Sequence, residues 1–136
     1  MSGPGNYNQQ VIEMFRANKG VVRGPNQLIL LTTTGAKSGK QRTTPVAYST
    51  VGDKLVIIAS KGGAPVNPDW YFNLVANPIV TVEQGTETFQ AHASVVADEA
   101  ERQRLYARHA ELMPGFAEYP KKTDRKIPVI LLERAS

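Results

Sequence analysis

The chain has 136 residues, 41 % of them hydrophobic, and a formal net charge of +4, which predicts a single domain over residues 1–136. It contains no cysteine, so disulfides, thiol catalysis and thiolate metal sites are excluded. Because no apolar run approaches the ~20 residues of a membrane-spanning helix and no secretory signal opens the chain, we expect a cytoplasmic protein that associates at most peripherally with the inner membrane face.

The first half of the chain predicts a helix followed by three strands. We expect residues 1–5 to be disordered, and Val11, Ile12, Met14 and Phe15 recur along one side of a predicted helix over residues 6–20. Pro45 cannot donate to a sheet ladder, so it places the second strand at an edge or a bulge. The predicted strands are 27–33, 42–51 and 54–60.

The second half predicts two helices and three more strands. Asn67-Pro68-Asp69 is typical of a helix start, with Asn67 as the cap, and this helix is expected to end near Ala76. Asp98 is expected to cap the next helix, which would bury Leu105, Tyr106 and Leu112. The further strands are 79–84, 87–96 and 128–133. About five or six mostly antiparallel strands with flanking helices predict an α+β fold built around a small barrel or curved sheet.

The residues of a self-sufficient catalyst are missing. His92 and His109 stand alone, so we interpret them as surface or half-buried structural residues and predict no metal site. No carboxylates are paired for acid–base work, and no Gly-x-Ser-x-Gly elbow is present. An enzyme with this sequence therefore needs a cofactor that brings the reactive group, and a hydride carrier fits that need.

Two glycine-containing loops and an uneven charge distribution indicate an anionic ligand. Between Met14 and Gly52 the chain has basic residues but no acidic one. Some of these cations lie in the loop Thr34–Arg42, where glycines let backbone N–H groups approach a ligand, although the spacing is not that of a Walker loop. A second loop, Ser60–Gly63, follows the third predicted strand. If consecutive strands pair, both loops converge on one phosphorylated ligand.

These residues, taken in order, resemble the deazaflavin-dependent nitroreductase family of actinobacteria. The resemblance runs from about Gln27 to Leu132 and implies a split β-barrel over residues 27–134 that uses reduced coenzyme F-420. This coenzyme is an 8-hydroxy-5-deazaflavin with a phosphate and an oligoglutamate tail. The matching segments are Leu31–Arg42, Pro45, Ala59–Gly63, Asn67–Tyr71, Asn73-Leu74 and Thr123–Pro128.

The resemblance also implies a set of cofactor-binding residues. By similarity, Lys37, Ser38, Gly39 and Arg42 would hold the phosphate and the acidic tail, and Thr43, Pro45 and Val46 would line the approach to the ring. Ile58, Ala59, Ser60, Lys61, Gly62 and Gly63 would wrap the deazaflavin, with Trp70, Tyr71 and Asn73 supporting it from the next helix. Flavin mononucleotide, which related split barrels bind, is the alternative cofactor, and the tail-binding cations favour the deazaflavin.

The acceptor half of the implied site departs from the family. Family members that reduce nitroimidazoles carry tyrosines where this chain has Met113 and Phe116, and only Tyr119 is retained; Ala47 likewise replaces a tyrosine. We therefore expect hydride transfer to a small hydrophobic acceptor, either an activated alkene (an enone or a coumarin-type lactone) or a quinone, with nitroreduction as the alternative. The proton would come from solvent or from a hydroxyl, for which Tyr119, Ser60 and Tyr48 are the candidates.

Two questions stay open on the sequence. A non-enzymatic reading, a cofactor-poor split barrel that binds lipid or another anion, is the alternative to the reductase. The chain could act as a monomer or a homodimer. Nucleic acid is not expected as a partner, because the basic residues lack interleaved aromatic platforms.

Overall fold

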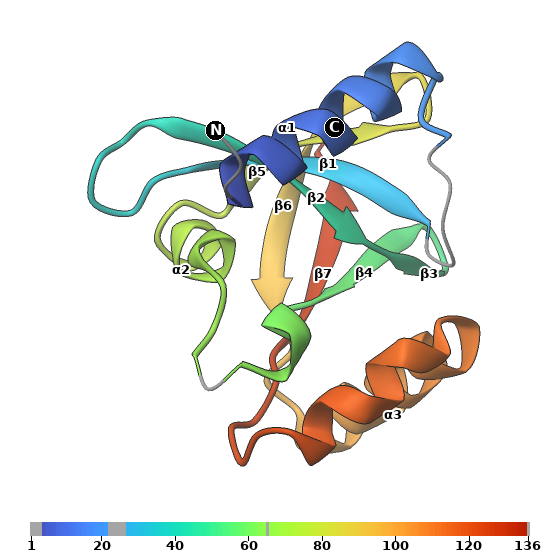
Figure 1. Cartoon of the computed structure of the whole chain (residues 1–136). Helices are drawn as coiled ribbons and strands as arrows, with labels where there is room; N and C mark the ends of the chain where they lie inside the picture. Colours follow the sequence, from blue (N-terminus) through green and yellow to red (C-terminus); the bar gives the residue numbers. More distant parts are fainter. Residues whose placement is uncertain (1–3, 22–26, 65, 136) are drawn as a thin grey trace.

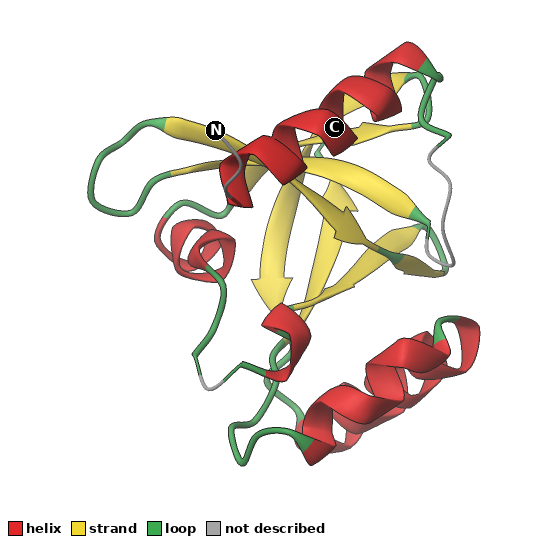
Figure 2. Ribbon diagram, viewed as in Figure 1, coloured by secondary structure: helices red, strands yellow, loops and turns green. Residues whose placement is uncertain are grey.

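Seven antiparallel strands form one curled sheet in the computed structural model, with helices packed around it (Figures 1 and 2). The structure describes residues 4–21, 27–64 and 66–135, without the side chains of residues 4–7 and the surroundings of Gly62. The elements are α1 (Pro4–Ala17), β1 (Leu28–Thr34), β2 (Gln41–Ala47), β3 (Ser49–Val51), β4 (Lys54–Ile58), the short helix η1 (Lys61–Gly63), α2 (Asp69–Ala76), β5 (Ile79–Gln84), β6 (Glu87–Val95), α3 (Glu99–Leu112), the 3-10 segment η2 (Pro114–Lys121) and β7 (Val129–Arg134).

The curl of the sheet comes from a strand that is broken in two. The strand order is β2-β1-β5-β6-β7-β4-β3, so β2 and β3 lie at opposite edges although only Tyr48 separates them in sequence. At this break the Tyr48 N–H makes the last bond of the β1–β2 ladder by donating to the carbonyl of Gln27 (3.1 Å), and the next residue, Ser49, already pairs with Val56 of β4. The α+β split barrel is thus confirmed. The expected strand 42–51 was wrong, because it serves two edges and brings the count to seven.

The strand that contains Pro45 is an edge strand, as expected. Pro45 faces Leu30 in the β1–β2 ladder, and nothing pairs with the other side of β2 in the described part of the chain. The expectation that consecutive strands pair holds for β1 with β2 and, through β3, for the expected strand 42–51 with β4, whereas β2 itself does not pair with β4, whose other neighbour is β7. The ends of the two glycine loops, Arg42 and Ser60-Lys61, line one cavity although the strands beside them, β2 and β4, are not neighbours in the sheet.

The main core fills the inside of this curled sheet. Apolar residues of β1, β4 and β7 meet there and are covered by Trp70 and Leu74 of α2. A second cluster joins β4 and β7 to α3 and η2, and a third packs Ile12 and Phe15 of α1 against Leu30. Because each of α1, α2 and α3 buries part of its surface on a different region of the sheet, the sheet fixes where all three lie (Figure 1).

Several local expectations were wrong in detail. Helix α1 begins at Pro4, so residues 4 and 5 are helical, while residues 1–3 lie outside the described part. Met14 and Leu112 are exposed, not buried. Asn67 does not cap α2: Pro68 holds the cap position, and the Asn67 side chain accepts a hydrogen bond from Arg125 instead. Asp98 does cap α3, accepting from the Glu101 N–H at 2.9 Å.

His109 takes the buried position on α3 that was expected for Leu112. It is completely buried, not at or near the surface as we expected, whereas His92 is exposed on β6. Its Nδ1 is hydrogen-bonded to Ser49 Oγ at 2.8 Å, and no described residue offers a partner to Nε2. Its ring meets Phe116 edge-on, with the centroids 4.5 Å apart. Burial lowers the pKa of His109 to about 4, because the charged ring would lose its hydration.

No helix among the described residues is both long and apolar enough to cross a bilayer.

The buried histidine predicts a stability loss in mild acid. The folded protein keeps His109 neutral down to about pH 4, whereas the unfolded chain takes up the proton near the ordinary pKa of about 6.5. The neutral His109 therefore leaves the unfolding free energy at its full value above pH 6.5, and the unfolding free energy decreases as the pH falls from 6.5 toward 4. Urea denaturation should show wild type losing about 3 kcal/mol more between pH 7 and pH 4 than His109→Gln loses. His92→Gln is the control and should lose as much as wild type; equal losses in all three proteins would contradict the prediction.

Candidate functional site

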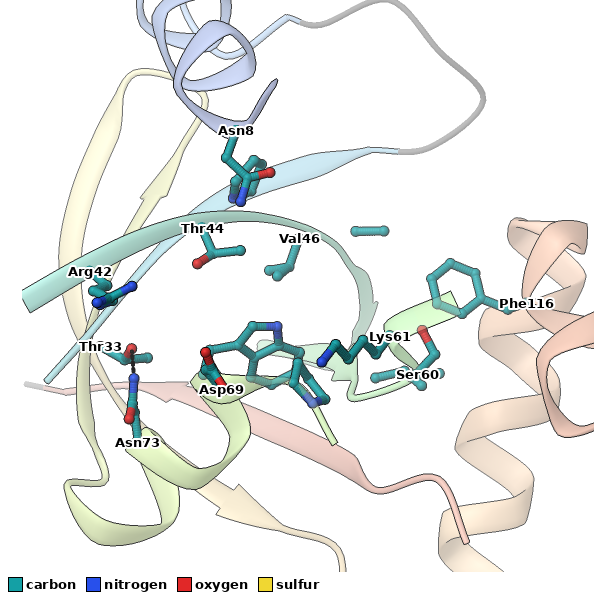
Figure 3. A pocket seen from close by; sticks show the side chains of 15 residues that line it. Asn8, Thr33, Arg42, Thr44, Val46, Ser60, Lys61, Asp69, Asn73 and Phe116 are labelled. Atoms are coloured by element: carbon teal, nitrogen blue, oxygen red, sulfur yellow. Dashed lines mark hydrogen bonds between the residues drawn. The ribbon is translucent and has the colours of Figure 1, made fainter. Parts of the chain in front are cut away.

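An open cleft of about 560 Å³ lies between the edge strand β2, the loop that follows β4 and the start of α2 (Figure 3). Figure 3 shows Arg42, Thr33 and Asn73 at one end and Lys61, Ser60 and Phe116 at the other. The expected cofactor residues that line it are Arg42, Pro45, Val46, Ile58, Ser60, Lys61, Trp70 and Asn73, and the expected acceptor residues are Ala47 and Phe116. The structure thus brings together residues from four separate segments of the chain.

A second cavity of about 570 Å³ continues the cleft under the β1–β2 loop. Lys37 and Ser38 line this second cavity, and Arg42, Asp69 and Asn73 line both. The two together form a track from the basic loop to the aromatic ring of Phe116. Asp69 is the only acidic residue along this track in the part of the chain that the structure describes, so the basic loop end is suited to an anionic group.

Asn73 of α2 holds the β1–β2 loop in place. Its side-chain Oδ1 accepts from the Ala36 N–H (3.0 Å) and its Nδ2 donates to Thr33 Oγ1 (3.2 Å). The loop closes on itself through the Gly35 N–H, which donates to the carbonyl of Lys40 at 2.7 Å. A Cβ added to Gly35 would lie 2.5 Å from Ser38 Oγ, so a larger residue would displace the Ser38 hydroxyl, which accepts a hydrogen bond from the Lys40 N–H. The turn leaves the side chains of residues 37 and 40 exposed.

The loop after β4 is held from behind by Arg125. The guanidinium donates to the carbonyl oxygens of Ala59 (3.1 Å), Ser60 (2.8 Å) and Ala64 (3.1 Å). Within the loop Lys61 adopts φ +48°, a left-handed conformation that is unfavourable for a residue with a side chain. Gly63, at φ +84°, packs so closely against η2 that an added Cβ would lie 2.9 Å from Lys122 Cβ. The loop is therefore fixed between Arg125 and η2.

The aromatic end of the cleft is anchored by α3. Phe116 is only 6 % exposed, yet its ring forms part of the cleft wall. The Tyr106 hydroxyl donates to the Phe116 carbonyl at 2.7 Å, and the His109 ring packs on the Phe116 ring. Burial is the main reason that the pKa of Tyr106 rises to about 12, so its hydroxyl stays protonated and keeps donating.

Only Ser60 among the three candidate proton donors lines the cleft. Tyr48 lies at the crossover from β2 to β3, and its hydroxyl is 3.4 Å from Gln84 Nε2. Tyr119 packs edge-on against Phe116, on η2, with the ring centroids 5.2 Å apart. Neither tyrosine lines the cleft: Tyr48 contacts Gln84 of β5, and Tyr119 packs on Phe116 within η2.

Other expected site residues also lie outside both cavities. Thr43 hydrogen-bonds Thr32 across the ladder (2.7 Å), and Met113 is buried in the cluster beneath η2. Ala59 is buried in the main core and Tyr71 packs against it. Gly39 and Gly63 are turn positions with positive φ. Gly62 lies in η1, and its surroundings fall outside the described part.

The sequence did not identify every residue of the cleft. Asn8 reaches it from α1, and Thr33, Thr44, Pro68 and Asp69 complete the wall (Figure 3). Asp69 could have been found from the sequence, since it stands at a recognised helix start. Asn8 could not, because only the packing of α1 on β1 and β2 brings it to the cleft. Among the described residues no group of three or more His, Cys, Asp or Glu is arranged to hold a metal ion.

Comparison with known proteins identifies close relatives. A family model described as F420H(2)-dependent quinone reductase matches residues 7–134. An F420H(2)-dependent quinone reductase of Mycobacterium tuberculosis is 36 % identical over 136 residues, covering 90 % of this chain and 91 % of that protein.

Two solved structures are also similar to the chain. An F420-H2 dependent reductase, FDR-A, is 44 % identical with a TM-score of 0.70, over 78 % of this chain and 93 % of its own. A domain-swapped dimer is 36 % identical with a TM-score of 0.73, over 96 % of this chain and all of its own.

The role of Asn73 in holding the basic loop can be measured without a ligand. In Asn73→Ala the Ala36 N–H and the buried Thr33 hydroxyl lose their partner, which should cost about 1–3 kcal/mol of unfolding free energy. Hydrogen exchange of the Ala36 amide should accelerate beyond the change in global stability. Asn77→Ala is the matched control, since Asn77 makes a single longer bond to the Thr34 carbonyl (3.3 Å). Unchanged exchange at Ala36 in Asn73→Ala would show that the loop holds itself.

Proposed function

Because the chain belongs to the F420H(2)-dependent quinone reductase family, we propose that it passes a hydride from reduced coenzyme F-420 to quinones in the cleft, and that activated alkenes are accepted in the same place. The observation that carries this proposal is the continuous track from a basic loop to an apolar wall. One end suits a polyanionic tail and the other a flat hydrophobic acceptor. A module that only bound an anion would need no apolar end, and the family match favours the reductase over a module that binds lipid.

The residues along the track fit coenzyme F-420. Lys37, Ser38, Gly39 and Arg42 would hold the phosphate and the oligoglutamate tail, since cations and backbone N–H groups are what such groups require. Bound in this way, the reduced coenzyme supplies a hydride. The ring would be contacted from the walls that Pro45, Val46, Ile58, Ser60, Lys61 and Trp70 form. Flavin mononucleotide has a phosphate but no oligoglutamate tail, so it would engage fewer of the cations of the β1–β2 loop.

The residues at the Phe116 end would bind the acceptor and exclude water from it. Ala47, Ile58 and the Phe116 ring give this end apolar walls, so an acceptor is held mainly by the area that it buries. Ser60 is the hydroxyl at this end, and we propose that it orients the acceptor oxygen and holds a proton for it, with solvent as the ultimate source. Tyr119 and Tyr48 would need to move before they could take that role. Few hydroxyls are available to bind a nitro group, so we rank nitroreduction below quinone and alkene reduction as the activity of this site.

We also propose a homodimer, of the two assemblies that the sequence left open. Support comes from the relative solved as a domain-swapped dimer, which is 36 % identical and is matched along its whole length.

The cofactor assignment predicts that charge reversal at the basic loop weakens binding. Lys37→Glu and Arg42→Glu should each lower the affinity for F-420 at least tenfold, about 1.4 kcal/mol, because a repelling charge replaces an attractive one. Fluorescence titration measures this, and added salt should weaken wild type more than the variants. Arg104→Glu, exposed on α3, makes the same change in net charge away from the track and is the control. If both loop variants bound F-420 as tightly as wild type, the tail would have to bind at another part of the surface.

The apolar acceptor end predicts the order of acceptors. With reduced F-420, wild type should turn over a naphthoquinone and a conjugated enone, and bicyclic nitroimidazoles little or not at all. Phe116→Tyr combined with Ala47→Tyr should shift activity toward the nitro compounds by adding hydroxyls to the wall. Phe89→Tyr is the control for a hydroxyl added remote from the cleft. Phe89 lies on β6, and Arg134 of β7 stacks over its ring. Nitroimidazole turnover by wild type as fast as its best quinone would refute the assignment of the acceptor end.

A further inference from the structure

Arg125 does not line the cleft, yet it donates four hydrogen bonds to the loop after β4 and to the residue ahead of α2. Its guanidinium binds three loop carbonyls, those of Ala59, Ser60 and Ala64, and also the side-chain oxygen of Asn67 just ahead of α2. A guanidinium has five N–H donors in a fixed plane. A single planar group therefore holds both the beginning and the end of the loop.

The partners of the Arg125 guanidinium are neutral oxygens of this loop and of Asn67, and it forms no ion pair with a described residue. No Asp or Glu forms a salt bridge with it within residues 4–21, 27–64 and 66–135, although six other ion pairs occur there. Burial lowers the pKa of Arg125, because removing the charge from water is unfavourable. A cation that is partly desolvated without a carboxylate costs stability unless its donors are all satisfied. The carbonyl contacts are what offsets this cost.

The contacts also determine what the loop presents to the cleft. In a trans peptide the C=O and the N–H point in opposite directions, and every peptide bond described is trans. The carbonyls of residues 59 and 60 point at Arg125, so their oxygens do not face the cleft. Oxygens that faced the cleft would repel an anion or another carbonyl. Ser60 and Lys61 instead turn their side chains into the cleft wall. The φ of +48° at Lys61 costs of order 1–3 kcal/mol, which the surroundings have to offset. Arg125 contributes to this by binding the carbonyls on both sides of Lys61, those of Ser60 and Ala64.

We propose that Arg125 is a positioning residue of the reductase site: by holding the carbonyls of the loop away from the cleft, it sets Ser60 and Lys61 to receive the carbonyl oxygens of a bound conjugated ring. This inference rests on the proposed function, because the ring is that of the deazaflavin or that of the acceptor. Both rings carry such oxygens, so the experiment has to tell which of them the loop serves.

The test compares Arg125→Lys with Arg102→Lys. Lysine keeps the charge but cannot serve four acceptors at once. Arg102 is the matched control, because it also donates to a backbone carbonyl, that of Ile127 (2.9 Å), but does not touch the loop. For both variants the melting temperature, the dissociation constant for F-420 and the kcat and KM for a naphthoquinone are measured. We expect Arg125→Lys to lose at least thirtyfold in kcat/KM and Arg102→Lys to stay within threefold of wild type.

The two ring assignments give different results. A rise in the F-420 dissociation constant with little change in quinone KM shows that the loop serves the coenzyme, and the reverse shows that it serves the acceptor. Either result supports the proposal. If kcat, KM and the dissociation constant of Arg125→Lys all stay within twofold of wild type, the proposal is overturned. Wild type inactive with reduced F-420 and quinone would instead overturn the proposed function, whatever Arg125 does.

Two further variants separate positioning from simple stability. In Arg125→Ala, guanidinium or methylguanidinium at millimolar concentration should restore activity, because the vacated position borders a cavity of about 280 Å³ that Arg125 lines with Tyr106 and Ile127. Absence of rescue in a folded Arg125→Ala counts against positioning. If neither Arg125 variant folds, Asn67→Ala removes just one of the four acceptors. It should then change the same kinetic constant about threefold, and an unchanged constant overturns the proposal.

Discussion

The whole arrangement depends on one stretch of eleven residues that supplies both edges of the sheet. Residues 41–47 pair with β1 and residues 49–51 pair with β4, and only Tyr48 lies between them. A sheet whose two edge strands are joined by one residue has to curl, because the edges cannot separate farther than that residue reaches. The open side of β2, left unpaired by Pro45, then becomes the wall of a cleft instead of a site for another strand. Fold and site thus have the same cause.

The two loops of the site are held by the same physical means. Beyond its few internal backbone bonds, each loop has backbone groups that a polar side chain from a distant part of the chain satisfies. Asn73 serves the Ala36 N–H of one loop, and Arg125 serves the carbonyls of the other. Glycine at positions 35 and 63 allows the close approaches that these contacts need. A rigid sheet can in this way carry irregular segments whose shape is nevertheless fixed.

The sequence allowed the class of fold, most element positions and several residues that line the cleft to be predicted, while the roles of those residues stay predictions. Period-2 and period-3.6 patterns and the Asp98 cap are local signals, and they were confirmed within a few residues. The break at Tyr48 was missed because nothing local distinguishes one long strand from two that pair at distant edges. The burial of His109 and the exposure of Leu112 were predicted the wrong way round, because the sequence of a charged helix does not show which face is buried. Asn8 and Arg125 could not be assigned, since each reaches the site only through tertiary packing.

The anchor of the aromatic end has a consequence for how such proteins diversify. Tyr106 holds the main-chain oxygen of residue 116, not its side chain. The backbone of η2 can therefore keep its place while the side chain at 116 changes from one lineage to another. The cost of such a change falls on the neighbouring rings, His109 and Tyr119, rather than on the barrel. Under the proposed function, residue 116 is thus a position where a single substitution alters the acceptor end of the cleft and leaves the basic end unchanged.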